Sequence, residues 1–189
     1  MVNIAVLGCG RIGAMHAANV AAHPRTNLEM VFDVNEMAVT NVSNAHQVQA
    51  ARSAQEVFAS DRVQAVLVAT ATPTHADYIE MAIAAGKPVL CEKPIDLNLE
   101  RVNRCAEVVS KSTVPIQLGF NRRYDPGHAA AREACLAGKI GDLHQVIITA
   151  RDPALPPRAY LEEAGGLFRD MTIHDFDLAR FMLNEEPVE

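Results

Sequence analysis

Short apolar runs alternate with longer helical patterns through the first two-thirds of the chain. The runs are nearly continuous in aliphatic residues, as expected for strands that are buried on both faces of a sheet. Such alternation favours a parallel sheet with helices on both faces, and therefore an α/β fold class. We predict strands over residues 3–7, 28–32, 65–69, 89–91 and 116–119, and helices over residues 12–22, 36–45, 75–85 and 99–110.

The character of the sequence changes after Gly119. A polar, turn-rich segment leads into a predicted helix over 128–137, an alternating strand over 143–150, a proline-rich loop over 152–157 and a final helix over 168–183. We therefore place a domain boundary near residue 120. Residues 1–120 form the first domain, and residues 121–189 belong to a second, α+β domain.

Composition limits the class of protein. With 49% hydrophobic and 21% charged residues, the chain is typical of a globular protein. Its net charge of −6 and its lack of a basic run argue against a nucleic-acid partner. No apolar stretch approaches the roughly 20 residues that span a bilayer, which predicts no membrane partner and a cytoplasmic location. The four cysteines are widely spaced, which indicates reduced thiols and no zinc site.

A glycine motif follows the first predicted strand and opens the first predicted helix. Residues 8–13 read G-C-G-R-I-G, so Gly8, Gly10 and Gly13 fit the G-x-G-x-x-G pattern in which backbone and helix N-terminus receive a pyrophosphate. Asp33, at the end of the second strand, can accept hydrogen bonds from adenosine ribose, which favours NAD over NADP. The fold is then a Rossmann-type sheet. A plain glycine turn beside a capping Asp is the alternative.

Lys93 follows the predicted strand 89–91, at the carboxyl edge where open α/β sheets bind ligands. Pro94 restricts the backbone beside it. A solvated surface lysine is the alternative. Thr70, Pro73 and His75 follow the neighbouring strand and are candidates for the nicotinamide side of a dinucleotide, although a helix N-cap at Thr74 explains them almost as well.

Asp170 and His174 are four residues apart on the final predicted helix, with Asp177 three residues further on, so all three share one face. A carboxylate and an imidazole so placed can form an oriented proton acceptor. Helix capping and metal ligation explain the same spacing, although no convincing third metal ligand is evident. The remaining histidines show no pairing in the sequence and are interpreted as structural or surface residues: His16, His23, His46, His128 and His144.

Five motifs in order resemble the glucose-fructose oxidoreductase/inositol dehydrogenase (Gfo/Idh/MocA) family. They are G-C-G-R-I-G at 8–13, T-P-T-H at 72–75, C-E-K-P at 91–94, G-F-N-R-R-Y-D-P at 119–126 and G-G-L-F-R-D-M-T-I-H-D-F-D at 165–177. The R-D-P at 151–153 together with the D-M-T-I-H-D helix makes the chain most similar to the myo-inositol 2-dehydrogenase branch.

The resemblance implies an NAD-dependent oxidoreductase that takes hydride from a CH–OH group of a cyclic polyol such as myo-inositol and yields a ketose. Lys93, Asp170 and His174 would be catalytic, with His174 as the base, and Arg122 and Asp152 would face the polyol. The cofactor-binding set would be Gly8, Gly10, Arg11, Ile12, Gly13, Asp33, Thr70, Pro73, His75, Glu92 and Lys93. A cis Lys93–Pro94 bond would accompany it, and no metal is implied.

The sequence departs from the family in its length. Family members continue into a large sheet that backs the substrate and forms a homo-oligomer face, whereas this sequence stops at Glu189. We therefore expect a fragment whose second domain is incomplete. A dinucleotide-binding fragment or regulatory remnant without turnover, and a dehydrogenase of another sugar, are the competing functional hypotheses.

Overall fold

The computed structural model describes residues 1–152, 154–156, 158, 161 and 164–188. The chain divides into two compact units, residues 1–119 and residues 120–189. The first unit is an α/β sheet domain, and the described part of the second unit consists of helices and connecting segments.

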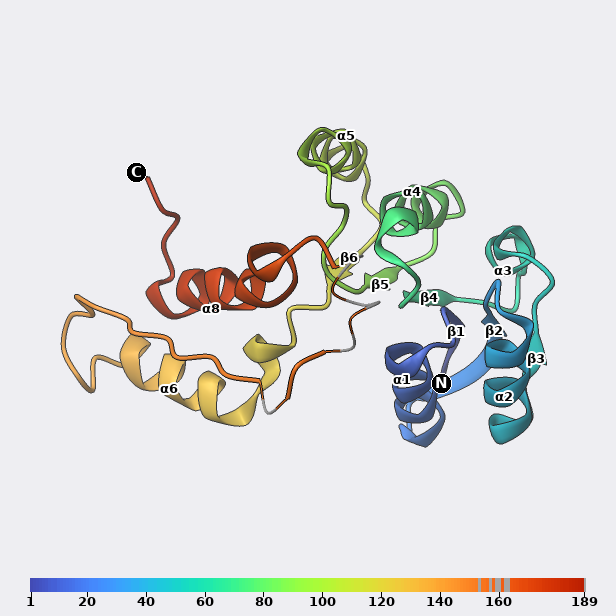
Figure 1. Ribbon diagram of the computed structural model, residues 1–189, viewed down its shortest axis with the longest axis horizontal. Coiled ribbons are helices and arrows are strands. Elements are labelled where there is room, and N and C mark those ends of the chain that lie inside the picture. The colour runs from blue at the N-terminus through green and yellow to red at the C-terminus, as the bar shows by residue number, and fades with distance from the viewer. Residues whose placement is uncertain (153, 157, 159–160, 162–163, 189) are drawn as a thin grey trace. The chain divides into compact units, whose positions relative to one another are not determined.

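The first unit is built on one parallel sheet of six strands (Figure 1). Its strand order is β3-β2-β1-β4-β5-β6, and every neighbouring pair is parallel. The direction of the strand order reverses between β1 and β4, which is where ligands bind in doubly wound sheets. The strands are β1 (Val2–Leu7), β2 (Thr26–Phe32), β3 (Gln49–Ala50), β4 (Ala65–Val68), β5 (Val89–Cys91) and β6 (Ile116–Leu118).

Helices cover both faces of this sheet, which confirms the predicted Rossmann-type fold class. They are α1 (Arg11–Ala22), α2 (Glu36–His46), α3 (Ala54–Ala59), α4 (His75–Ala84) and α5 (Leu99–Ser110). Helices α1 and α2 contribute to one buried cluster, and α3, α4 and α5 contribute to the other. Strand β1 serves both, because Ala5 and Leu7 point to one cluster while Val6 points to the other. Figure 1 shows the two helical layers on opposite sides of the strands.

Two short elements of the first unit were not predicted. Strand β3 has only two residues, both exposed, and α3 has only six. Neither is long enough to show a clear hydrophobic period. Strand β3 forms by pairing with β2, and α3 is stabilised by its Ser53 cap. Tertiary context thus supplies what the local sequence does not encode.

The second unit contains η2 (Asn121–Tyr124), α6 (Pro126–Leu136), the π-helical turn η3 (Phe168–Thr172) and α8 (Ile173–Leu183). Asp125 caps α6 by accepting the His128 N–H at 3.0 Å. The final helix was predicted as continuous α-helix over 168–183, but its first five residues are π-helical. A π-turn widens the helix locally and is frequent at functional sites.

The strand predicted over 143–150 is wrong. None of these residues is in a strand, and Ile147 is 80% exposed. Alternating polarity alone cannot hold a strand, because its N–H and C=O groups need a ladder partner. Within the described residues of this unit no other segment is extended into a strand that could supply one. In the loop predicted over 152–157, Pro153 and Pro157 lie outside the described residues.

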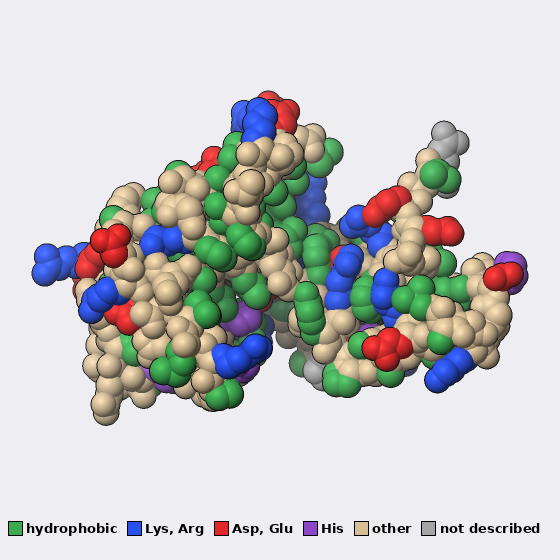
Figure 2. Space-filling model, turned by 180° about the vertical axis from the view of Figure 1, so that it is seen from behind, with side chains coloured by type: hydrophobic (Ala, Val, Ile, Leu, Met, Phe, Trp, Pro, Cys, Tyr) green, Lys and Arg blue, Asp and Glu red, His purple; other side chains and the backbone are tan. Residues whose placement is uncertain are grey.

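The surface carries charges of both signs. On the face shown in Figure 2, Lys and Arg side chains are interspersed with Asp and Glu side chains. None of the helices in the described part of the chain has the length and apolarity needed to cross a bilayer.

Candidate functional site

The glycine motif forms a tight turn between β1 and α1 in which each glycine has a different environment. Gly8 has a φ of 95°, and a Cβ there would collide with the Ala69 carbonyl. A Cβ on Gly13 would collide with the carbonyl oxygen of Gly8, so α1 packs directly on the turn. Gly10 has no heavy atom within 4 Å of its Cβ position. The open side of Gly10 is therefore the place where a ligand can approach the backbone.

The N-terminus of α1 receives no side-chain hydrogen bond. Helices α4 and α8 also lack a side-chain cap, whereas α2, α3, α5 and α6 are capped by Asn35, Ser53, Asn98 and Asp125 respectively. An uncapped N-terminus presents backbone N–H donors and a partial positive charge, which suits a phosphate. With the opening at Gly10, this end of α1 fits the pyrophosphate of a dinucleotide.

Asp33 lies beside this turn, just past the end of β2. Its Oδ2 accepts the Cys9 N–H at 2.6 Å, and its Oδ1 accepts the Asn35 N–H at 2.8 Å. The carboxylate is therefore fixed next to the glycine turn. Burial, and then the Asp33 charge, raise the pKa of the Cys9 thiol to about 12, so this cysteine stays protonated and unreactive at neutral pH.

A hollow of about 350 Å³ opens next to Asp33, between the start of α1 and the start of α2. Its lining includes Arg11 and Ala14 from α1 and Met37, Ala38 and Val42 from α2. A hollow with apolar and polar lining beside a fixed carboxylate suits an adenosine, whose base is apolar on its faces and whose ribose offers hydroxyl donors. The residues present thus fit a dinucleotide such as NAD.

His75 ties together two loops at the carboxyl edge of the sheet. It is only 2% exposed, and its Nδ1 lies 2.7 Å from the Pro94 carbonyl oxygen while its Nε2 lies 3.0 Å from that of Thr70. The Thr74 hydroxyl contacts the Thr70 hydroxyl at 2.7 Å and donates to the Ala71 carbonyl, so it does not cap α4. Pro73 lies in the short 3-10 turn η1 (Thr72–Thr74) before α4.

Glu92 and Lys93 follow β5 at the same edge of the sheet, and the Lys93–Pro94 peptide bond is cis, as the family resemblance implied. The Glu92 carboxylate contacts His16 Nε2 on α1, at 2.8 Å. His16 shows no partner in the sequence and was interpreted as a structural or surface residue; the structure pairs it with Glu92. The sequence holds no local signal for this contact, because the two residues lie 76 positions apart.

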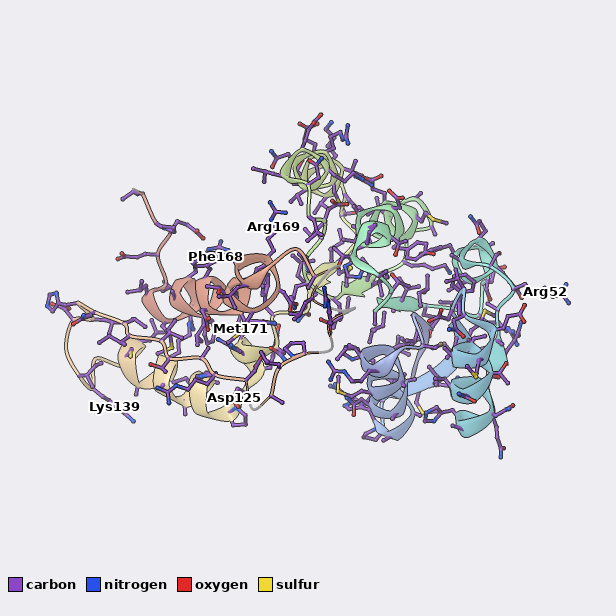
Figure 3. All side chains as sticks on the ribbon, in the orientation of Figure 1. Arg52, Asp125, Lys139, Phe168, Arg169 and Met171 are labelled. Carbon is purple, nitrogen blue, oxygen red and sulfur yellow. The ribbon has the colours of Figure 1, made fainter. Side chains whose placement is uncertain are left out.

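The second unit holds the other predicted site residues. Asp170 lies in the π-helical turn and His174 at the start of α8, where the ring of Phe120 packs edge-on against His174 with centroids 6.3 Å apart. Phe168 and Arg169 extend from the turn into solvent, whereas Met171 is half-buried (Figure 3).

Two arginines of η2 pair with carboxylates of α8. Arg122 donates to Asp175, and Arg123 donates to both oxygens of Asp177 at 2.8 and 2.6 Å. Asp177 is 4% exposed, so it serves the packing of this unit rather than an open site face. Asp152 is exposed. Among the residues that the structure describes, no three His, Cys, Asp or Glu side chains are grouped to hold a metal ion.

Comparison with models of protein families identifies the family of this chain. Residues 2–120 match the model described as an oxidoreductase family with an NAD-binding Rossmann fold (GFO_IDH_MocA), and residues 128–189 match the GFO/IDH/MocA C-terminal domain. The chain belongs to the Gfo/Idh/MocA family. Its first unit is the family's NAD-binding Rossmann domain.

Relatives and solved structures agree with this membership. Inositol 2-dehydrogenase of Rhizobium meliloti is 46% identical over 99% of this chain and 56% of its own length. A myo-inositol dehydrogenase structure from Corynebacterium glutamicum is 43% identical with a TM-score of 0.91, covering 96% of this chain and 55% of that one. A scyllo-inositol dehydrogenase from Lactobacillus casei, solved with NAD(H) and scyllo-inositol, is 30% identical with a TM-score of 0.86, covering 98% and 57%. The chain thus spans little more than half of these relatives' length.

Proposed function

We propose that the chain provides the cofactor site and the proton-transferring residues of an NAD-dependent dehydrogenase that oxidises a CH–OH group of a cyclic polyol, of which myo-inositol is the first candidate. The glycine turn carries this proposal, because its open Gly10, uncapped α1 and adjacent Asp33 form one continuous fit to a dinucleotide. The similarity to inositol dehydrogenases supports the choice of polyol.

The reaction converts CH–OH and NAD⁺ into C=O, NADH and a proton. When bound, NAD supplies the hydride acceptor. His174 takes the hydroxyl proton, and Asp170 orients its imidazole and stabilises the charged ring. The Lys93 ammonium donates to the same hydroxyl oxygen and stabilises the negative charge that develops there. Arg122 and Asp152 are the proposed polyol contacts in the second unit.

The test is NADH formation, followed by absorbance, when the protein is mixed with NAD and a panel of inositols and aldoses at alkaline pH. Lys93→Ala and His174→Ala are each expected to lower turnover by about 10²-fold or more, while NADH affinity stays within about twofold. Lys111→Ala and His144→Ala are the matched controls, since both positions are exposed.

Two results would contradict the proposal in different ways. If Lys93→Ala loses NADH binding together with turnover, Lys93 binds the cofactor and has no separate role in the chemical step. Tight NADH binding without any NADH formed from the whole panel would instead favour a dinucleotide-binding module without turnover.

A further inference from the structure

The contact between His16 and Glu92 joins two parts of the cofactor site. His16 lies on α1, the helix whose N-terminus faces the pyrophosphate position, and Glu92 immediately precedes Lys93. The Nε2–Oε1 distance is 2.8 Å, and the two side chains are 18% and 22% exposed. Both groups are therefore largely withdrawn from water, which sets them apart from an ordinary surface ion pair.

Two further neighbours of the Glu92 carboxylate are the Lys93 backbone and Gly119. The backbone N–H of Lys93 donates a hydrogen bond to the carboxylate. Gly119, directly after β6, leaves the space for its Oε2, because a Cβ at that position would lie 2.8 Å from this oxygen. Gly119 has no positive φ, so the glycine provides space rather than an unusual backbone conformation. The carboxylate is thus held by His16 and by the Lys93 N–H, and Gly119 leaves room for its Oε2.

The balance of charge keeps Glu92 ionised. Burial opposes ionisation, but the hydrogen bond and charge of His16, together with Lys93, outweigh it, and the pKa of Glu92 falls below its ordinary value. An ionised carboxylate offers only acceptors, which match the hydroxyl donors of a ribose.

We propose that His16 is a positioning residue: it fixes the Glu92 carboxylate at the end of β5 for the contact with the nicotinamide-side ribose that the family resemblance implies for Glu92. The inference rests on the proposed function, because it assumes a dinucleotide in this site. His16 does not touch the ligand. It links α1, the helix that receives the pyrophosphate, to the loop that carries Lys93. The two parts of the protein that bind the two halves of the dinucleotide are therefore fixed relative to each other.

The decisive experiment compares two ligands by calorimetry. NADH carries the nicotinamide-side ribose, whereas ADP has the adenosine and both phosphates but lacks that ribose. In His16→Ala, NADH affinity is expected to fall about tenfold, as for a lost hydrogen bond to a charged group, while ADP affinity stays within about twofold. His16→Gln keeps a side-chain donor and should recover part of the loss. His23→Ala, exposed at the end of α1, is the control.

A second variant tests the carboxylate from its other side. In Gly119→Ala the new methyl group would displace Oε2, so NADH binding should weaken relative to ADP as it does in His16→Ala. In the double variant the released carboxylate can move away from the methyl group. The combined loss should therefore be smaller than the product of the single losses.

Three results would overturn the inference. Equal weakening of NADH and ADP would mean that His16 stabilises α1 as a whole, and unchanged NADH affinity would leave the contact without a ligand role. Independent effects of the two substitutions would separate Gly119 from Glu92. If the NADH-to-ADP pattern holds while no polyol yields NADH, the dehydrogenase proposal fails and the role of His16 stands.

Discussion

The two units of this chain are stabilised by different kinds of interaction. The first unit buries two layers of aliphatic side chains against a parallel sheet, and many of them are less than 2% exposed. In the described part of the second unit, Leu178 is the only buried hydrophobic side chain, at 5% exposed. Arginine side chains instead make many of the contacts between the elements of this unit. Arg132 of α6, for example, donates to the Phe181 carbonyl at 2.8 Å and lies 4.6 Å from the centre of its ring.

The difference shows how each part holds its functional residues. A close-packed sheet fixes backbone positions, which is what a pyrophosphate turn requires. Arginine–carboxylate pairs fix side-chain directions, because the planar guanidinium has preferred bonding geometry. The second unit is accordingly expected to respond to salt and charge changes, and the first unit to changes in side-chain volume.

The largest expected effect is the loss of volume in the sheet domain. Ile79 of α4 is fully buried, so Ile79→Ala should lower the free energy of unfolding of the first unit by about 3–4 kcal/mol. Urea unfolding followed by circular dichroism measures this. Ile147→Ala, at an 80% exposed position of the second unit, is expected to change stability by less than about 0.5 kcal/mol. Similar losses in both variants would remove the contrast between the units.

A smaller effect is expected from charge removal in the second unit. Asp177→Asn keeps the shape of a 4% exposed side chain but removes its charge opposite Arg123, which should cost about 1–3 kcal/mol. Proteolysis rates of the second unit measure the change. In Glu186→Gln, which breaks an exposed pair with Arg180, little change is expected. An Asp177→Asn protein as resistant as the original would show that this pair adds no stability.

The smallest expected effect is the loss of stability at low pH. Because the folded-state pKa of Glu92 is depressed, its pairing adds stability that is present above the unfolded pKa and is lost as pH falls through the folded pKa. We expect less than about 1 kcal/mol from this group, lost below about pH 4.5. Melting temperatures of the original protein and of Glu92→Gln between pH 3 and 7 test this. The two curves should converge at the acid end, and parallel curves would contradict the assignment.

Much of the sheet domain could be predicted from sequence, because its signals are local. Continuous apolar runs such as residues 3–7 indicate buried strands, and the glycine spacing indicates the turn after β1. Features that depend on distant partners could not be predicted. The contact of His16 with Glu92 joins residues 76 positions apart, and nothing near His16 indicates it.

The errors in the second unit have the same origin. Residues 143–150 have the alternation of a strand, but strand formation depends on a neighbour rather than on the segment itself. The helical spacing of Asp170 and His174 predicted their shared helical segment but not the π-turn, since the side-chain period changes little over five residues. The candidate catalytic residues could be named from motifs, whereas their surroundings required the structure.

The His75 contacts have a consequence for how the edge of the sheet tolerates mutation. Both partners of its ring are main-chain carbonyl oxygens, those of Thr70 and Pro94. Every amino acid carries such an oxygen, so substitutions at positions 70 and 94 keep both contacting oxygens in the chain. The link between the two loops therefore depends on one side chain, that of His75, and a substitution at position 75 removes it most directly.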